Sequence, residues 1–116
     1  MLKNDFDIKY KNIRPTNYKN YNIGIIGAGN IIENSHLPTY IEANLNITNI
    51  YDLDFKKSSY LKEKFKIKKI SNTLIEFLED KNINIVDIAV PAEHNKDIFF
   101  KVLEYDNEYI NSETII

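Results

Sequence analysis

The chain of 116 residues has no cysteine and only two histidines, which excludes several kinds of chemistry. Without cysteine there can be no disulfide, no thiolate nucleophile and no zinc site that depends on sulfur ligands. With His36 and His94 as the imidazoles, a metal site would have to be rich in carboxylates, and the sequence contains no such cluster. We therefore expect no metal site.

An excess of charge of one sign is also lacking. The 15 basic and 17 acidic residues give a net charge of −2, which creates no field that would gather nucleic acid or anionic lipid. The sequence has no signal-peptide core, and no apolar run approaches the length that crosses a membrane. These absences favour a cytoplasmic protein without a nucleic-acid or membrane partner, and the length predicts one domain with a real core.

What the sequence does contain is an apolar strand that runs directly into a glycine turn. Residues 23–26 are followed by Gly27-Ala-Gly29 and then by residues compatible with a helix. Gly27 allows a tight turn with a positive φ, and Gly29 has no Cβ to hold a pyrophosphate away from the backbone. The phosphate would then meet the free N–H groups and positive dipole end of the helix. The third glycine of the usual fingerprint is replaced by Ile32, which predicts a slightly wider helix contact and not a lost phosphate site.

A second strand strengthens the prediction of a dinucleotide site. Residues 46–51 read as a strand that ends in Asp52, about 20 residues beyond the turn, where such folds place a ribose-binding acid. A carboxylate there accepts hydrogen bonds from the ribose hydroxyls and repels a 2′-phosphate, which favours NAD over NADP. The alternative is that the glycines form an ordinary turn and that Asp52 and Asp54 only cap the helix that begins near Phe55.

Strands alternate with helices along the rest of the chain, which predicts right-handed crossovers and a parallel sheet. We expect a single α/β domain with a Rossmann-like doubly wound parallel sheet of about five or six strands over residues 22–116, preceded by an N-terminal arm over residues 1–21. The remaining expected elements are a first crossover helix over 30–43 broken at 35–37, a helix over 55–65, a strand at 68–70, a helix opened by a capping box at Thr73-Leu-Ile-Glu76, a strand over 83–90, a helix over 95–105 and a strand at 108–110.

Five stretches of the sequence resemble the N-terminal domain of the Gfo/Idh/MocA oxidoreductases, the family of glucose-fructose oxidoreductase and inositol dehydrogenase. They occur in the family's order and are residues 22–31, His36-Leu-Pro-Thr-Tyr40, Ile50-Tyr-Asp52, Thr73-Leu-Ile-Glu-Phe-Leu78 and Val86-Asp-Ile-Ala-Val-Pro91. The resemblance implies a Rossmann fold, an NAD(P) cofactor and hydride transfer at a carbon that bears a hydroxyl or carbonyl group, often in a sugar, cyclitol or similar alcohol.

The same resemblance implies positions along the cofactor for nine residues. The pyrophosphate would lie along Gly27, Ala28, Gly29, Asn30 and Ile31, the adenosine ribose at Asp52, and the nicotinamide-side ribose near Val90, Pro91 and Ala92. His36 would lie beside the cofactor or would simply pack the broken crossover. His94 could reach the cofactor or remain an exposed loop residue, and Asn95 is interpreted as a helix cap.

Two departures from the family bear on catalysis. The family's Glu-Lys-Pro or Gln-Lys-Pro motif supplies a proton-donating lysine, but Glu113 stands at that position here and Thr114 replaces the proline. An ionised carboxylate can neither donate that proton nor stabilise an alkoxide, so we assign no catalytic residue. The substrate-binding C-terminal half is the second missing part. We expect a truncated cofactor domain without turnover of its own, to be completed by a partner or the missing domain; the alternative is a non-catalytic NAD(H) sensor or docking module.

Overall fold

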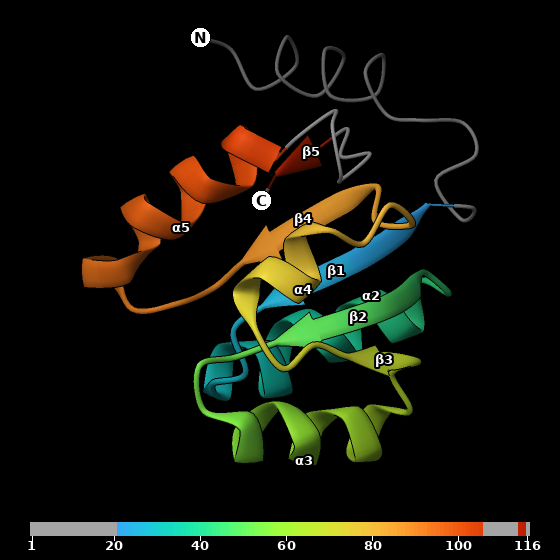
Figure 1. Ribbon diagram of the computed structural model, residues 1–116. Coiled ribbons are helices and arrows are strands. Elements are labelled where there is room, and N and C mark those ends of the chain that lie inside the picture. Colours follow the sequence, from blue (N-terminus) through green and yellow to red (C-terminus); the bar gives the residue numbers. More distant parts are fainter. Residues whose placement is uncertain (1–20, 106–113, 116) are drawn as a thin grey trace, which may run out of the picture.

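The structure is a computed structural model that describes residues 21–105 and 114–115. Its elements, in chain order, are β1 (Asn22–Ile26), η2 (Ile32–His36, a π-helix), α2 (Leu37–Glu42), β2 (Asn46–Tyr51), α3 (Phe55–Phe65), β3 (Lys69–Ile70), α4 (Leu74–Leu78), β4 (Ile85–Ile88), α5 (Ala92–Tyr105) and β5 (Thr114–Ile115). The strands form one parallel sheet in the order β3-β2-β1-β4-β5 (Figure 1). The predicted Rossmann-like parallel sheet is therefore confirmed. The strand predicted at 108–110, and residues 1–20 of the predicted arm, lie outside the described residues.

The two faces of the sheet bury different side chains, because successive residues of a strand point to opposite sides. In β1, Ile23 and Ile25 belong to the core that contains residues of η2, α2 and α3, whereas Ile26 packs with residues of α4 and α5. In β4, Val86 and Ile88 also belong to the core on the α4 and α5 side. Ile85 of β4 packs against the core on the other face, so both β1 and β4 are covered on two faces, as their nearly continuous apolar sequence predicts.

Gly27 is the residue at which β1, β2 and β4 come together. Its N–H donates to the carbonyl oxygen of Tyr51 at 2.8 Å, and the N–H of Ala89 donates to the carbonyl oxygen of Ile26 at 2.9 Å. The φ of Gly27 is +123°, and a Cβ at this position would collide with the carbonyl oxygen of Ala89. The conformation and the close approach both require glycine, so the predicted turn with positive φ is confirmed.

The helix after the glycine turn is continuous, so the predicted break at residues 35–37 is wrong. It begins in α form at Asn30, widens into η2 and continues as α2. The N–H of Leu37 donates to the carbonyl oxygen of Ile32, which is the bond of a π-turn. Pro38 has no N–H with which to continue an α-helical ladder, and the π-turn before it provides a different hydrogen-bond pattern. The chain therefore changes helix width here and does not leave the helix.

The elements on either side of Pro91 differ from their predicted bounds. β4 ends at Ile88, before its predicted end at Val90, and α5 begins directly after Pro91. The carbonyl oxygen of Pro91 accepts the N–H of His94 at 2.9 Å, so the first helical turn starts at the proline. Asn95 consequently lies inside α5, and its predicted role as a helix cap is wrong.

The capping box predicted at α4 is present in a slightly longer form. The Thr73 hydroxyl accepts the N–H of Glu76 at 3.1 Å, as a capping residue should. The Glu76 carboxylate reaches back to the N–H of Asn72 at 3.0 Å, one residue before the cap. β2 and α3 have the predicted bounds.

The geometry at Gly27 generates a stability prediction. Replacement of Gly27 by alanine forces a side chain into the positive-φ region and against Ala89, which we expect to lower the free energy of unfolding by about 3 kcal/mol or more. Urea denaturation followed by circular dichroism measures the loss. Gly29→Ala is the matched control, because a Cβ at Gly29 has no atom within 4 Å. A similar change in both variants would contradict the structural requirement at Gly27.

Candidate functional site

A pocket of about 530 Å³ opens where the strands β1, β2 and β4 end. Gly29, Asp52, Val90 and Pro91, four of the nine predicted cofactor-binding residues, line it. Its other lining residues are Ile26, Tyr51, Leu53, Asp54, Lys57, Leu74, Ala89, His94, Asp97 and Ile98. The volume is in the range of small-molecule sites, and the carboxyl edge of a parallel sheet is where such folds bind ligands.

The other predicted residues lie next to this lining but outside it. Ala28 is buried between the two glycines, whereas Asn30 and Ile31 are exposed at the first turn of the helix. Gly27 is buried in the strand junction, and Ala92 is exposed at the start of α5. Four of the nine predicted residues thus share one pocket at this edge of the sheet, and the other five lie beside it.

Asp52 connects the end of β2 to the glycine turn. One oxygen of its carboxylate, Oδ2, accepts the N–H of Ala28 at 2.7 Å, and the other, Oδ1, accepts the N–H of Asp54 at 2.7 Å. The cap of α3 comes from Asp54, whose carboxylate accepts the N–H of Lys56 at 3.1 Å. The capping alternative thus holds for Asp54 and not for Asp52. Each Asp52 oxygen retains a lone pair that can accept a further hydrogen bond.

The glycine turn leaves open space beside Gly29. A Cβ at Gly29 would have no atom within 4 Å, so the backbone can be approached closely from the pocket. The carbonyl oxygen of Gly29 accepts the N–H of Glu33 at 3.1 Å, which makes Gly29 part of the first helical turn. The N–H groups of that first turn have no partner within the helix, and they carry the positive end of its dipole.

The pocket combines an acidic edge with an apolar wall. Asp52, Asp54 and Asp97 contribute carboxylates, and Lys57 stands on the same lining. Burial, with a smaller contribution from Asp52, raises the pKa of Tyr51, which keeps its phenol neutral beside the carboxylate. This arrangement suits a ligand with a flat apolar part and hydroxyl groups that donate hydrogen bonds.

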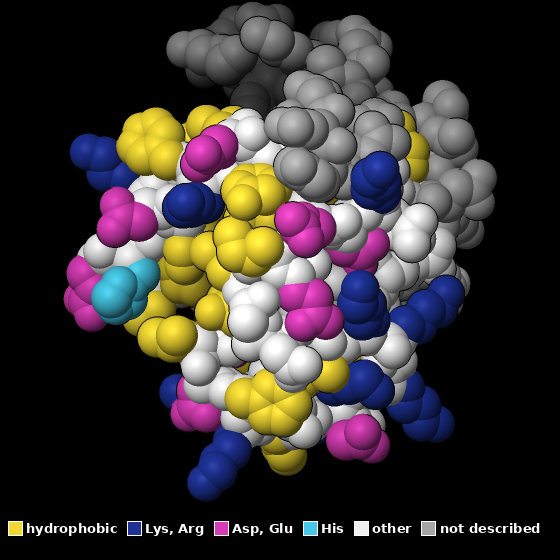
Figure 2. Space-filling view, in the orientation of Figure 1, with side chains coloured by type: hydrophobic (Ala, Val, Ile, Leu, Met, Phe, Trp, Pro, Cys, Tyr) yellow, Lys and Arg dark blue, Asp and Glu magenta, His cyan; other side chains and the backbone are white. Residues whose placement is uncertain are grey.

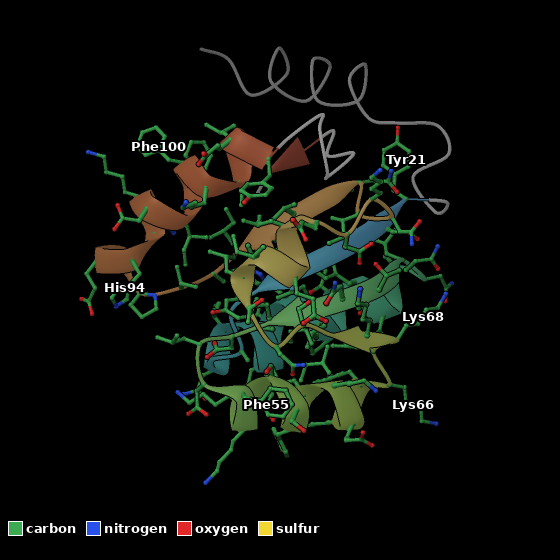
Figure 3. All side chains as sticks on the ribbon, viewed as in Figure 1. Tyr21, Phe55, Lys66, Lys68, His94 and Phe100 are labelled. Carbon is green, nitrogen blue, oxygen red and sulfur yellow. The ribbon has the colours of Figure 1, made fainter. Side chains whose placement is uncertain are left out.

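His94 lies at the start of α5, at the edge of the pocket (Figure 3). Its side chain is 60% exposed, and its Nε2 is 3.7 Å from the exposed carboxylate of Glu93. In the space-filling view, hydrophobic side chains gather next to this histidine (Figure 2). The side chain is exposed, as one hypothesis predicts, but it lies in the first turn of α5 and not in a loop. Contact between His94 and the cofactor stays a prediction.

His36 does not line the pocket but belongs to a polar cluster on the α2 side of the sheet. Its Nδ1 lies 2.7 Å from Oδ2 of Asp87, and the hydroxyl of Tyr40 donates to the same oxygen at 2.6 Å. Burial and the Asp87 carboxylate raise the pKa of Tyr40 well above its usual range. The sequence patterns did not predict a role for Asp87 or Tyr40. A signal for Asp87 is that it is a lone acid within the apolar run Val86-Asp-Ile-Ala-Val90.

A metal cluster and a membrane-spanning helix are both absent from the described residues. That part of the chain contains no group of three or more histidine, cysteine, aspartate or glutamate residues that could hold a metal ion. Within the same residues, none of the helices is long and apolar enough to cross a membrane. The pocket at the carboxyl edge remains the candidate site.

Comparison with known proteins agrees with this geometry. A family model described as an oxidoreductase family with an NAD-binding Rossmann fold matches residues 21–111. Uncharacterized protein YMR315W of Saccharomyces cerevisiae is 32% identical over 91 residues, which are 72% of this chain and 25% of that protein.

Solved structures show the same architecture. An NAD-binding protein from Listeria innocua is 26% identical with a TM-score of 0.65, and the match covers 75% of this chain and 25% of that one. KijD10, a 3-ketoreductase from Actinomadura kijaniata in complex with NADP and TDP-benzene, is 18% identical with a TM-score of 0.67 over 81% of this chain and 27% of that one. The chain thus spans about a quarter of the length of these relatives. Because the family model covers most of the chain, the protein belongs to the Gfo/Idh/MocA oxidoreductase family and has its NAD-binding Rossmann fold, as the sequence predicted.

Proposed function

We propose that the chain is the cofactor domain of an oxidoreductase and binds an NAD-type dinucleotide in the pocket at the carboxyl edge of the sheet. The observation that carries the proposal is the hydrogen bond from Ala28 to Asp52, which brings the glycine turn and the acid at the end of β2 to one pocket. An ordinary turn has no need of an acid from the next strand, whereas a dinucleotide needs both a phosphate site and a ribose site.

Each part of the dinucleotide has residues of suitable chemistry. The pyrophosphate lies at Gly29, where the backbone is open and the N–H groups of Asn30 and Ile31 begin the helix. The adenosine ribose donates its hydroxyls to the remaining lone pairs of Asp52. The nicotinamide-side ribose lies toward Val90, Pro91 and Ala92, which follow β4.

The charge of the pocket supports NAD as the cofactor in preference to NADP. A 2′-phosphate would carry about −1.5 to −2 charges at pH 7 and would lie beside Asp52. Asp54, on the same lining, adds to the repulsion, and Lys57 opposes it only in part. A relative with this fold, KijD10, was solved with NADP, so the charge around the ribose decides the preference and the fold does not.

The bound dinucleotide would supply hydride chemistry, and the chain's residues would hold and orient it. Substrate binding and proton transfer are proposed to lie outside this chain, since Thr114 in β5 stands where the family has the proline of its Lys-Pro motif. The proposed substrate class is therefore that of the family, a sugar, cyclitol or similar alcohol. A partner or an additional domain would provide the groups that recognise it, and we expect no turnover from this chain alone.

Gly29→Val tests the phosphate site. The branched side chain would occupy the open space beside Gly29 and exclude the pyrophosphate, which we expect to weaken NADH binding at least about 30-fold. The fold should survive, because no atom lies within 4 Å of the new Cβ position. Isothermal titration calorimetry with NADH measures the affinity, and thermal unfolding monitors the fold.

Thr39→Val is the matched control for Gly29→Val. Thr39 is exposed on α2 and does not line the pocket, so the same side chain there should leave NADH affinity unchanged. Undiminished binding by Gly29→Val would refute the phosphate site, and failure of the wild-type chain to bind NADH or NADPH would refute the proposed function as a whole.

Asp52→Ala tests the ribose site and the cofactor preference. The substitution frees the N–H of Ala28 and removes the acceptor for the ribose, so both cofactors should bind more weakly. NADH should lose more than NADPH, since the repulsion of the 2′-phosphate disappears, and we expect the ratio of affinities to move about tenfold toward NADPH. Titrations with both cofactors at matched ionic strength measure the ratio. Equal fold losses for NADH and NADPH would count against the proposed ribose contact.

A further inference from the structure

Asp87 is a buried acid that no step of the proposed function uses. Its side chain is 1% exposed in the middle of the sheet, where it pairs in register with Ile25 of β1. Oδ2 accepts the hydroxyl of Tyr40 at 2.6 Å and lies 2.7 Å from Nδ1 of His36. Oδ1 is buried and has no hydrogen-bond partner among the described residues. We refer to Asp87, His36 and Tyr40 as the Asp87 clamp.

Stabilisation of the fold does not by itself explain the Asp87 clamp. Burial of a carboxylate costs free energy that hydrogen bonds must offset, and here one oxygen receives both contacts while the other receives none. An apolar residue at this position of β4 would avoid that cost, as Ile85 and Ala89 do on the same face of the sheet. A better explanation for the acid is that its contacts fix the position of the helix that carries His36 and Tyr40.

The clamp acts on the helix that begins at the glycine turn. His36 ends the π-helix η2 and Tyr40 follows in α2, so both contacts attach the later turns of this helix to β4. Ile32, at the position of the missing third glycine, is fully buried at the start of η2 and separates the helix from the strand. Ile32 therefore holds the start of the helix away from the sheet, and the Asp87 clamp holds the later turns of the helix toward it.

We propose that His36, Tyr40 and Asp87 are positioning residues for the dinucleotide, which compensate for the missing third glycine by fixing the angle of the helix. The inference rests on the proposed cofactor site. The helix is continuous from Asn30 to Glu42, so a change in its contacts at the far end would alter the position of the N–H groups that face the pyrophosphate. A misplacement of about 1 Å can cost an enzyme about a hundredfold in rate, so small movements of positioned groups have large effects. None of the three residues lines the pocket, so the effect passes through the helix.

A positioning role for the Asp87 clamp predicts an effect on ligand binding that a purely structural role does not. If it positions the phosphate-binding end of the helix, its loss should weaken ligands that carry a pyrophosphate and spare adenosine, which meets Asp52 and the apolar wall. A general loss of stability would instead lower the affinity for all ligands together. The comparison of NADH and ADP with adenosine therefore separates the two roles.

Tyr40→Phe is the principal variant, because it removes one hydrogen bond and keeps the ring. We expect it to weaken NADH and ADP by about tenfold, near the lower end of the effect of one lost hydrogen bond to a charged group, and adenosine by less than about twofold. Tyr105→Phe is the matched control, since Tyr105 lies at the end of α5, packs on the other face of the sheet and does not line this pocket. It should change none of the three affinities.

Substitutions of Asp87 provide a second, independent measurement. Asp87→Asn keeps an oxygen that can accept from Tyr40, so it should retain more NADH and ADP affinity than Asp87→Leu, which keeps none. Calorimetry with NADH and NMR titration with ADP and adenosine give the affinities, and circular dichroism verifies the fold of each variant. If Asp87→Leu does not fold, Tyr40→Phe and Asp87→Asn still decide the matter.

The possible results are distinguishable. Selective loss of NADH and ADP binding in Tyr40→Phe, with a smaller loss in Asp87→Asn than in Asp87→Leu, supports the positioning role. Equal losses for adenosine and ADP, or unchanged affinities throughout, would overturn that role while wild-type NADH binding leaves the cofactor site standing. Failure of the wild-type chain to bind NADH would overturn the cofactor site and the clamp's role with it.

Discussion

The close approach of β4 to the glycine turn is the constraint on which the site depends. Gly27 donates to Tyr51 of β2, and its Cα lies so near Ala89, beyond β4, that no side chain fits between them. These contacts end three parallel strands at one place, and the next helix must leave from there. A pocket at the carboxyl edge follows directly, because the segments that depart from the three strands diverge from a common point.

Asp52 has two duties that cannot be separated by mutation. The same carboxylate holds the N–H of Ala28 in the glycine turn and presents lone pairs to the pocket. Its negative charge is suited to the first duty because a charged acceptor strengthens the hydrogen bond from the backbone. That charge would also repel a phosphate on the ribose, so the cofactor preference that we propose would partly be a consequence of how the turn is held.

Sequence patterns predicted well those features that depend on local chemistry. α3 has the predicted bounds because helical periodicity is a local signal, and β2 has them because a short run rich in β-branched residues ends at Asp52. The Thr73 cap also follows from residues only three apart. The predicted helix break at 35–37 and the predicted cap at Asn95 are wrong for a shared reason, which is that each region contains a proline. Pro38 follows a π-turn within a continuous helix, and Pro91 begins the first turn of α5. Whether a proline breaks a helix or is accommodated in this way depends on packing.

The candidate site was predictable in outline from the sequence, but the contacts that hold the helix beside it were not. Glycines and an acid at fixed spacing indicate the pocket, whereas the contacts of Asp87 join residues 47 and 51 positions apart and leave no periodic pattern. Only the lone acid in an apolar strand was visible. A glycine at the third fingerprint position would set the helix angle through close backbone packing. With Ile32 there, the angle must be set by contacts along the rest of the helix, and the buried carboxylate gives a directional contact that apolar packing alone would not.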